Sequence, residues 1–121
     1  MVLAVKLISV AGLKDEDTIG SNDLYVRIST DEKNWVKSSL KKGAGKQAVF
    51  DELFTFDVLP QPNAKLYVEV YDKDPLKDDK LGTASVSLSD IGAEQKDVVV
   101  ELHRHLIHRH AGVVNLRVSH I

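Results

Sequence analysis

The stretch LYVEVYD, residues 66–72, decides how the chain folds. Its aliphatic residues Leu66, Val68 and Val70 share one parity, so their side chains lie on one face of an extended backbone. Alternation of this kind, rich in β-branched and aromatic residues, predicts a β-strand with one buried face. Asp72 continues the same parity, so we expect a carboxylate at the end of the inward-facing row.

Strand patterns of this kind recur along the whole chain. They cover residues 2–10, 24–29, 35–40, 50–58, 84–88, 98–100 and 114–118, with glycine- and proline-containing turns between them. About eight short strands at this spacing predict an all-β fold, an eight-stranded antiparallel β-sandwich. Residues 89–94 are expected to form a single turn of helix, with Ser89 as its N-cap.

The composition limits the class of protein. The 121 residues are the size of one domain, and we expect a single domain over residues 1–121. Sixteen Lys and Arg balance 18 Asp and Glu, which argues against a nucleic-acid binder, because such proteins are usually markedly basic. The absence of cysteine and of any apolar run of roughly 18 residues predicts a cytoplasmic protein without a spanning helix.

The acidic residues gather in two inter-strand segments, residues 15–23 and residues 72–79. Like charges this close repel each other unless a cation compensates them. Asp72 and Asp74 lie two positions apart at a strand end, so both carboxylates point the same way. Converging carboxylates are the ligands that a hard cation such as Ca²⁺ requires. An EF-hand is excluded, because neither segment has glutamate at the twelfth loop position and flanking helices are absent.

Three linked motifs resemble those of C2 domains. Residues 12–26 contain GL and then DTIGSNDLYV, similar to the family's first-loop pattern GL…D..G.SDPYV. Residues 49–56, VFDELFTF, resemble its VWNE.F.F strand, and residues 70–82, from VYDKD to DKLG, resemble its third loop. The resemblance covers nearly the whole chain and implies a C2-like Greek key. An extra final strand at residues 113–118 implies the family's second circular permutation.

The resemblance also implies a calcium site and a function. The family's five calcium aspartates fall on Asp17, Asp23, Asp72, Asp74 and Asp79. The interval from Asp74 to Asp79 is one residue short, so Asp78 competes for the fifth position. The sequence also departs from the family where Leu24 replaces proline and residues 47–48 replace Asn-Pro. The implied function is Ca²⁺-dependent, reversible binding to anionic phospholipid membranes by a peripheral protein, through an electrostatic switch.

Two apolar residues are expected at the tips of the acidic loops. Ile19 lies in the first loop, and Leu76 follows Pro75 in the third. Each would gain on the order of 1–3 kcal/mol when buried from water, which assists membrane docking without anchoring the protein alone. The alternative for Ile19 is packing beneath its own loop.

A basic segment suggests a second lipid contact. Trp35, Lys37 and Lys41 share one parity, so we expect them to line one surface, with Lys42 and Lys46 in the following loop. In many C2 domains such a lysine-rich patch engages phosphoinositide headgroups, so the resemblance implies this partner. The alternative is an edge strand that lysines protect from aggregation.

The remaining motifs are weaker. Residues 103–110 hold four of the five histidines, and an exposed turn, a transition-metal pair and a pH-sensitive patch are the alternatives there. No arrangement of residues supports catalysis, so we do not expect an enzyme. The rival to calcium-dependent membrane binding is a calcium-independent module of the same fold that binds a protein partner.

Overall fold

The structure, a computed structural model, describes residues 1–13, 22–58, 61–104 and 110–121. The predicted all-β fold is confirmed, with eight antiparallel strands. The strands are β1 (Val2–Ala11), β2 (Leu24–Ser29), β3 (Val36–Lys37), β4 (Ala48–Asp57), β5 (Lys65–Asp72), β6 (Asp79–Ser87), β7 (Lys96–His103) and β8 (His110–His120). Within these described ranges, no helix is long and apolar enough to cross a bilayer.

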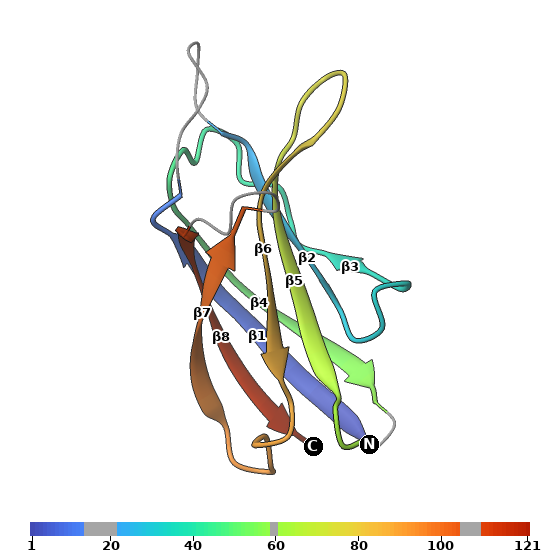
Figure 1. Cartoon of the computed structure of the whole chain (residues 1–121). Helices are drawn as coiled ribbons and strands as arrows, with labels where there is room; N and C mark the ends of the chain where they lie inside the picture. The colour runs from blue at the N-terminus through green and yellow to red at the C-terminus, as the bar shows by residue number, and fades with distance from the viewer. Residues whose placement is uncertain (14–21, 59–60, 105–109) are drawn as a thin grey trace.

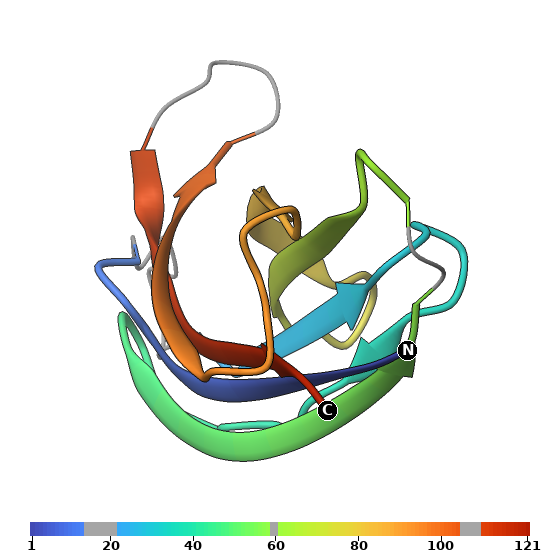
Figure 2. The same ribbon diagram turned by 90° about the horizontal axis from the view of Figure 1, so that it is seen from below.

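The strands form two layers of a sandwich. Their order is β3-β2-β5-β6-β7-β8-β1-β4, and the pair Thr83–His103 alone connects β6 to β7 in the described ladder. One layer therefore contains β3, β2, β5 and β6, and the other contains β7, β8, β1 and β4. Figure 2 shows β4, β1, β8 and β7 as one curved layer facing β2, β5 and β6. The expected final strand is confirmed as β8, which lies between β7 and β1.

Alternate side chains from both layers fill the core. Leu3, Val5 and Leu7 of β1 are fully buried, as are Leu66 and Val68 of β5. Burying side chains of this size stabilises a fold by about 1.5–3 kcal/mol each relative to exposure. The core therefore fixes which face of each strand points inward, and the polar residues of the same strands are placed by this choice.

The third strand is much shorter than the sequence predicts. Only Val36–Lys37 pairs regularly with β2, and the chain then bulges before Lys41 bridges to Leu24. Glu52 of β4 is the physical reason, because its carboxylate accepts hydrogen bonds from the backbone N–H (3.0 Å) and hydroxyl (2.7 Å) of Ser39. The side chain holds this segment toward the neighbouring edge strand.

The predicted turn of helix at residues 89–94 is wrong. The N–H of Ile91 donates to the carbonyl of Leu88 at 3.1 Å, which closes a single turn. The carbonyl of Gly92 instead accepts from the N–H of His120 in β8 at 2.7 Å. This hydrogen bond ties the segment to β8, and residues 89–94 form turns and bends without a helix.

Candidate functional site

Three carboxylates converge at the end of the sandwich where β5 passes into β6. Asp72 ends β5, Asp79 begins β6, and the two are register partners; Asp74 lies in the connection. One carboxylate oxygen from each residue lies within 4.8 Å of the others. Figure 1 shows this connection projecting from the end opposite the two termini. The antiparallel register explains the arrangement, because directly paired residues present their side chains on the same face.

Asp72 holds the position that its parity predicts. It continues the inward-facing row of β5, and its side chain is only 4% exposed. Its Oδ1 accepts a hydrogen bond from the N–H of Asp23 at 2.8 Å. A carboxylate this well buried has little access to water, so its contacts within the protein and with any bound cation determine its energy.

Asp23 connects three segments beside this carboxylate cluster. Its Oδ1 accepts from the N–H of Gly43 at 2.7 Å, and its carbonyl oxygen accepts from the N–H of Lys73 at 2.8 Å. The structure therefore brings Asp23 next to Asp72, although the converging oxygens come from Asp72, Asp74 and Asp79. Asp17 and Ile19, which the sequence also proposes, lie outside the described residues.

Asp78 has a different environment from Asp79. Its Oδ2 accepts a hydrogen bond from the Tyr25 hydroxyl at 2.5 Å, and its Oδ1 accepts from the N–H of Asp74 at 3.1 Å. The bond from Tyr25 is the main reason that the pKa of Asp78 lies below its ordinary value. Burial and then the bond to Asp78 raise the pKa of Tyr25. The geometry brings Asp79, rather than Asp78, together with Asp72 and Asp74.

This donor set suits a hard divalent cation. The converging atoms are carboxylate oxygens, which Ca²⁺ and Mg²⁺ prefer over the nitrogen and sulfur ligands typical of zinc. Three ionised carboxylates at this separation also repel one another. The residues present therefore fit a calcium ion in ligand type and in charge.

The basic segment does not form the single surface expected from its parity. The Lys37 ammonium lies 5.1 Å from the centre of the Tyr25 ring, whereas that of Lys41 lies 5.7 Å from the ring of Phe50, a core residue. The prediction that Lys37 and Lys41 line one surface is wrong, because the bulge between them reverses the alternation. Lys42 and Lys46 are exposed in the loop that follows.

An interaction network on the outer face of the β3-β2-β5-β6 layer was not found from the sequence. Glu69 contacts Arg27, the ammonium of Lys80 (2.9 Å) and the hydroxyl of Tyr71 (2.9 Å). Burial alone would raise the pKa of Glu69, but the hydrogen bonds from these three side chains hold it below its ordinary value. Arg27 also covers the Trp35 ring, 4.1 Å from its centre. The signal that could have indicated this network is the alternation in β2 and β5, which places polar and aromatic residues together on the outer face.

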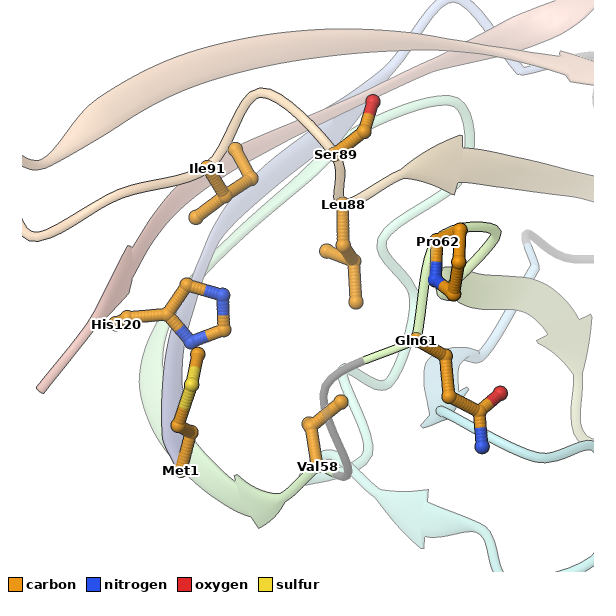
Figure 3. A pocket seen from close by; sticks show the side chains of 8 residues that line it. All are labelled: Met1, Val58, Gln61, Pro62, Leu88, Ser89, Ile91 and His120. Atoms are coloured by element: carbon orange, nitrogen blue, oxygen red, sulfur yellow. The ribbon is translucent and has the colours of Figure 1, made fainter.

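The other distinctive features lie away from the acidic cluster. A cavity of about 410 Å³ opens among Met1, Val58, Leu88 and His120 (Figure 3), on the side of the two chain ends. The Nδ1 atom of His120 is buried there without a hydrogen-bond partner among the described residues. In the histidine-rich segment, His103 and His110 are exposed register partners, and residues 105–109 lie outside the described part of the chain.

Comparison with known proteins identifies the family. A family model described as C2 domain matches residues 1–104. The chain belongs to the C2 domain family. A curated relative, 16 kDa phloem protein 2 of Arabidopsis thaliana, is 31% identical over 93 residues, which span 76% of this chain and 62% of that protein. This chain thus matches less than two thirds of the phloem protein.

Solved C2 structures share the fold over almost the whole chain. A C2 domain of plant Extended Synaptotagmin 1 superimposes with a TM-score of 0.87 at 23% identity, covering 99% of this chain and 95% of that one. The calcium-bound pair of C2 domains of Extended-Synaptotagmin 2 superimposes with a TM-score of 0.81 at 24% identity, covering 98% of this chain and 45% of that one. At 23% and 24% sequence identity, these superpositions show that the fold is shared.

Proposed function

We propose that this C2 domain binds Ca²⁺ and, when loaded, docks reversibly on anionic phospholipid membranes. The observation that carries the proposal is the convergence of Asp72, Asp74 and Asp79 within 4.8 Å at one end of the sandwich. The calcium-bound state of a relative with the same fold supports this choice of ion. In this proposal the protein is cytoplasmic and becomes a peripheral membrane protein in response to calcium.

The acidic cluster would respond to the ion through charge. Asp72, Asp74 and Asp79 would hold the ion, with Asp23 beside them and Asp17 proposed from the sequence motif. The bound ion would supply the positive charge that compensates these carboxylates. The repulsion between this end of the protein and an anionic bilayer then falls, without a large change of shape.

The same connection offers an apolar side chain to the membrane. Leu76 is 99% exposed between Asp74 and Asp79. Insertion of this side chain contributes on the order of 1–3 kcal/mol. A contribution of this size assists docking but does not keep the protein on the membrane alone. Ile19 remains a second proposed tip residue.

A basic surface would add a weaker contact with lipid. Lys37, Lys42 and Lys46 are exposed, while Trp35 and Lys41 are partly covered. Each lysine near an anionic surface contributes about 1 kcal/mol. Phosphoinositide headgroups are the proposed partner of Lys37, Lys42 and Lys46. Trp35 is a neighbour of this surface, and the Lys41 ammonium lies near the ring of Phe50.

Calorimetric titration with Ca²⁺ tests the proposal, with and without vesicles containing phosphatidylserine. The expected result is binding heat in both cases, with tighter binding when anionic vesicles are present. Vesicles of phosphatidylcholine alone are the control for surface charge. Absence of heat in every case would overturn calcium binding and favour the module that binds a protein partner without calcium.

A further inference from the structure

Asp74 differs from the other two clustered carboxylates in how its backbone is held. Asp72 belongs to β5 and Asp79 to β6, so strand pairing fixes both. Asp74 lies outside the strands, in a connection whose tip residues Pro75, Leu76 and Lys77 are all exposed. Packing against the core therefore does not explain how Asp74 is kept beside its two partners.

Hydrogen bonds through Asp78 supply the missing support. Its Oδ1 accepts from the N–H of Asp74 at 3.1 Å, which joins the two sides of the connection. Its Oδ2 accepts from the hydroxyl of Tyr25 at 2.5 Å, which ties the connection to β2. Both oxygens of Asp78 are thus engaged by the protein, in directions that leave this carboxylate outside the three-residue cluster.

Tyr25 is itself firmly held. It is 7% exposed, and its ring stacks on that of Tyr71 with centres 5.2 Å apart and planes 8° from parallel. The Lys37 ammonium lies 5.1 Å from the centre of the same ring. A rigid aromatic side chain in a regular strand thus fixes the position of the phenol oxygen that Asp78 meets.

We propose that Tyr25 and Asp78 form a positioning pair that holds Asp74 ready for the cation, and that Asp78 is not itself a ligand. The proposal rests on the calcium site proposed above. It assigns Asp78 to support and Asp79 to coordination. It also makes a residue of the outer sheet face, Tyr25, a determinant of calcium affinity without any contact with the ion.

Calcium titration of substituted proteins tests the pair. Removing the hydroxyl in Tyr25→Phe is expected to weaken binding by roughly three- to tenfold, because it removes a hydrogen bond to a charged group. Asp78→Ala is expected to weaken binding at least as much, because it also removes the bond to the N–H of Asp74. The double variant is expected to bind about as weakly as Asp78→Ala alone, since Tyr25 reaches Asp74 only through Asp78. Tyr71→Phe is the matched control, because its hydroxyl bonds to Glu69 in the same aromatic stack.

Hydrogen exchange of the Asp74 amide in the ion-free protein gives a second readout. Exchange at this amide is expected to be faster in Tyr25→Phe and in Asp78→Ala than in the wild type and Tyr71→Phe. A general loss of stability would instead accelerate exchange across the strands of all variants. This measurement requires no calcium, so it separates the pair's hold on Asp74 from the proposed function.

Two results would overturn the proposal. Unchanged calcium affinity and unchanged Asp74 exchange in Tyr25→Phe would show that the phenol does not position the connection. A loss of calcium affinity in Asp78→Ala with unchanged exchange at the Asp74 amide would make Asp78 a ligand. If the wild type binds no calcium, the proposed function and the cation role of the pair both fail, whatever the exchange rates show.

Discussion

Two carboxylates of β5 lie three residues apart on opposite faces of the strand and have contrasting neighbours. Glu69, on the outer face, contacts the cationic side chains of Arg27 and Lys80 and the hydroxyl of Tyr71. Asp72, at the end of the inner face, lies within 4.8 Å of two further carboxylates. Both residues are largely buried, at 8% and 4% exposed.

The difference in neighbouring charges assigns Glu69 to support of the fold and Asp72 to the proposed binding of a cation. The charge of Glu69 is compensated by groups that the chain itself provides, so this carboxylate needs no bound ion to stabilise the sheet. The charge of Asp72 is reinforced by Asp74 and Asp79, which raises the electrostatic energy of the ion-free protein. That stored repulsion is what a bound divalent cation would release. Burial alone therefore does not distinguish the two carboxylates; the charges of their described neighbours do.

The largest expected effect comes from neutralising the acidic cluster. Asp72→Asn with Asp74→Asn keeps the side-chain shapes but removes two charges, and calcium affinity is expected to fall on the order of a hundredfold or more. Calcium-dependent pelleting with anionic vesicles is then lost. The ion-free variant is expected to melt at a higher temperature than the ion-free wild type. Unchanged pelleting would contradict the assignment of both aspartates.

Glu69→Gln tests the carboxylate whose charge is compensated by neighbouring cationic side chains. Removing the charge leaves Arg27 and Lys80 without their anionic partner, and the free energy of unfolding is expected to fall by about 1–3 kcal/mol. Urea denaturation measures this change. Calcium affinity should stay at the wild-type value, because Glu69 faces away from the cluster. A large loss of affinity would mean that the two faces of β5 are coupled.

Leu76→Ser removes the exposed apolar side chain from the β5–β6 connection and leaves the charges of this connection unchanged. Membrane affinity in calcium is expected to fall roughly fivefold, since the inserted apolar area is lost, while calcium affinity and melting temperature stay unchanged. The side chain is 99% exposed, so it contributes nothing to packing. Vesicle pelleting over a lipid series measures the effect, and equal pelleting of both proteins would remove Leu76 from the docking surface.

The smallest expected effect is on the pH dependence of stability. The pKa of Glu69 is lower in the folded protein than its ordinary value of 4.5, so its stabilisation is fully present above that pH. Stabilisation is lost as the pH falls below the ordinary value and through the folded pKa. The difference in unfolding free energy between wild type and Glu69→Gln should therefore be constant from about pH 7 to pH 5 and shrink below. A difference that grows on acidification would contradict this sign.

The fold and part of the site could be predicted from local patterns. The alternation of Leu66, Val68 and Val70 is a short-range property, and the core confirms it. The same alternation, continued from Val70 to Asp72, predicts that Asp72 points to the inner face of the sheet, and the structure shows it buried there. Asp79 follows less directly, because its proximity to Asp72 depends on the register of β6 against β5. The sequence left Asp78 and Asp79 as competitors because the interval from Asp74 to Asp79 is one residue shorter than in the family pattern.

The failed expectations share one physical cause. Lys41 departs from the face of Lys37 because the side chain of Glu52, on another strand, holds Ser39. The segment after Leu88 forms turns and no helix, and the carbonyl of Gly92 bonds to the N–H of His120 in β8. In both cases a contact between residues distant in the sequence outweighs a local preference, and no local pattern contains that contact.

By itself the sequence determined that this chain is an eight-stranded sandwich of C2 type with acids concentrated in two of its connections. Strand alternation and turn residues act over a few positions, so they can be read without the fold. Only the tertiary structure decided which carboxylates meet, which one is compensated by cations, and which one bonds to Tyr25. These outcomes depend on register and on contacts across the sandwich, because electrostatic energy follows distance in space and not distance along the chain.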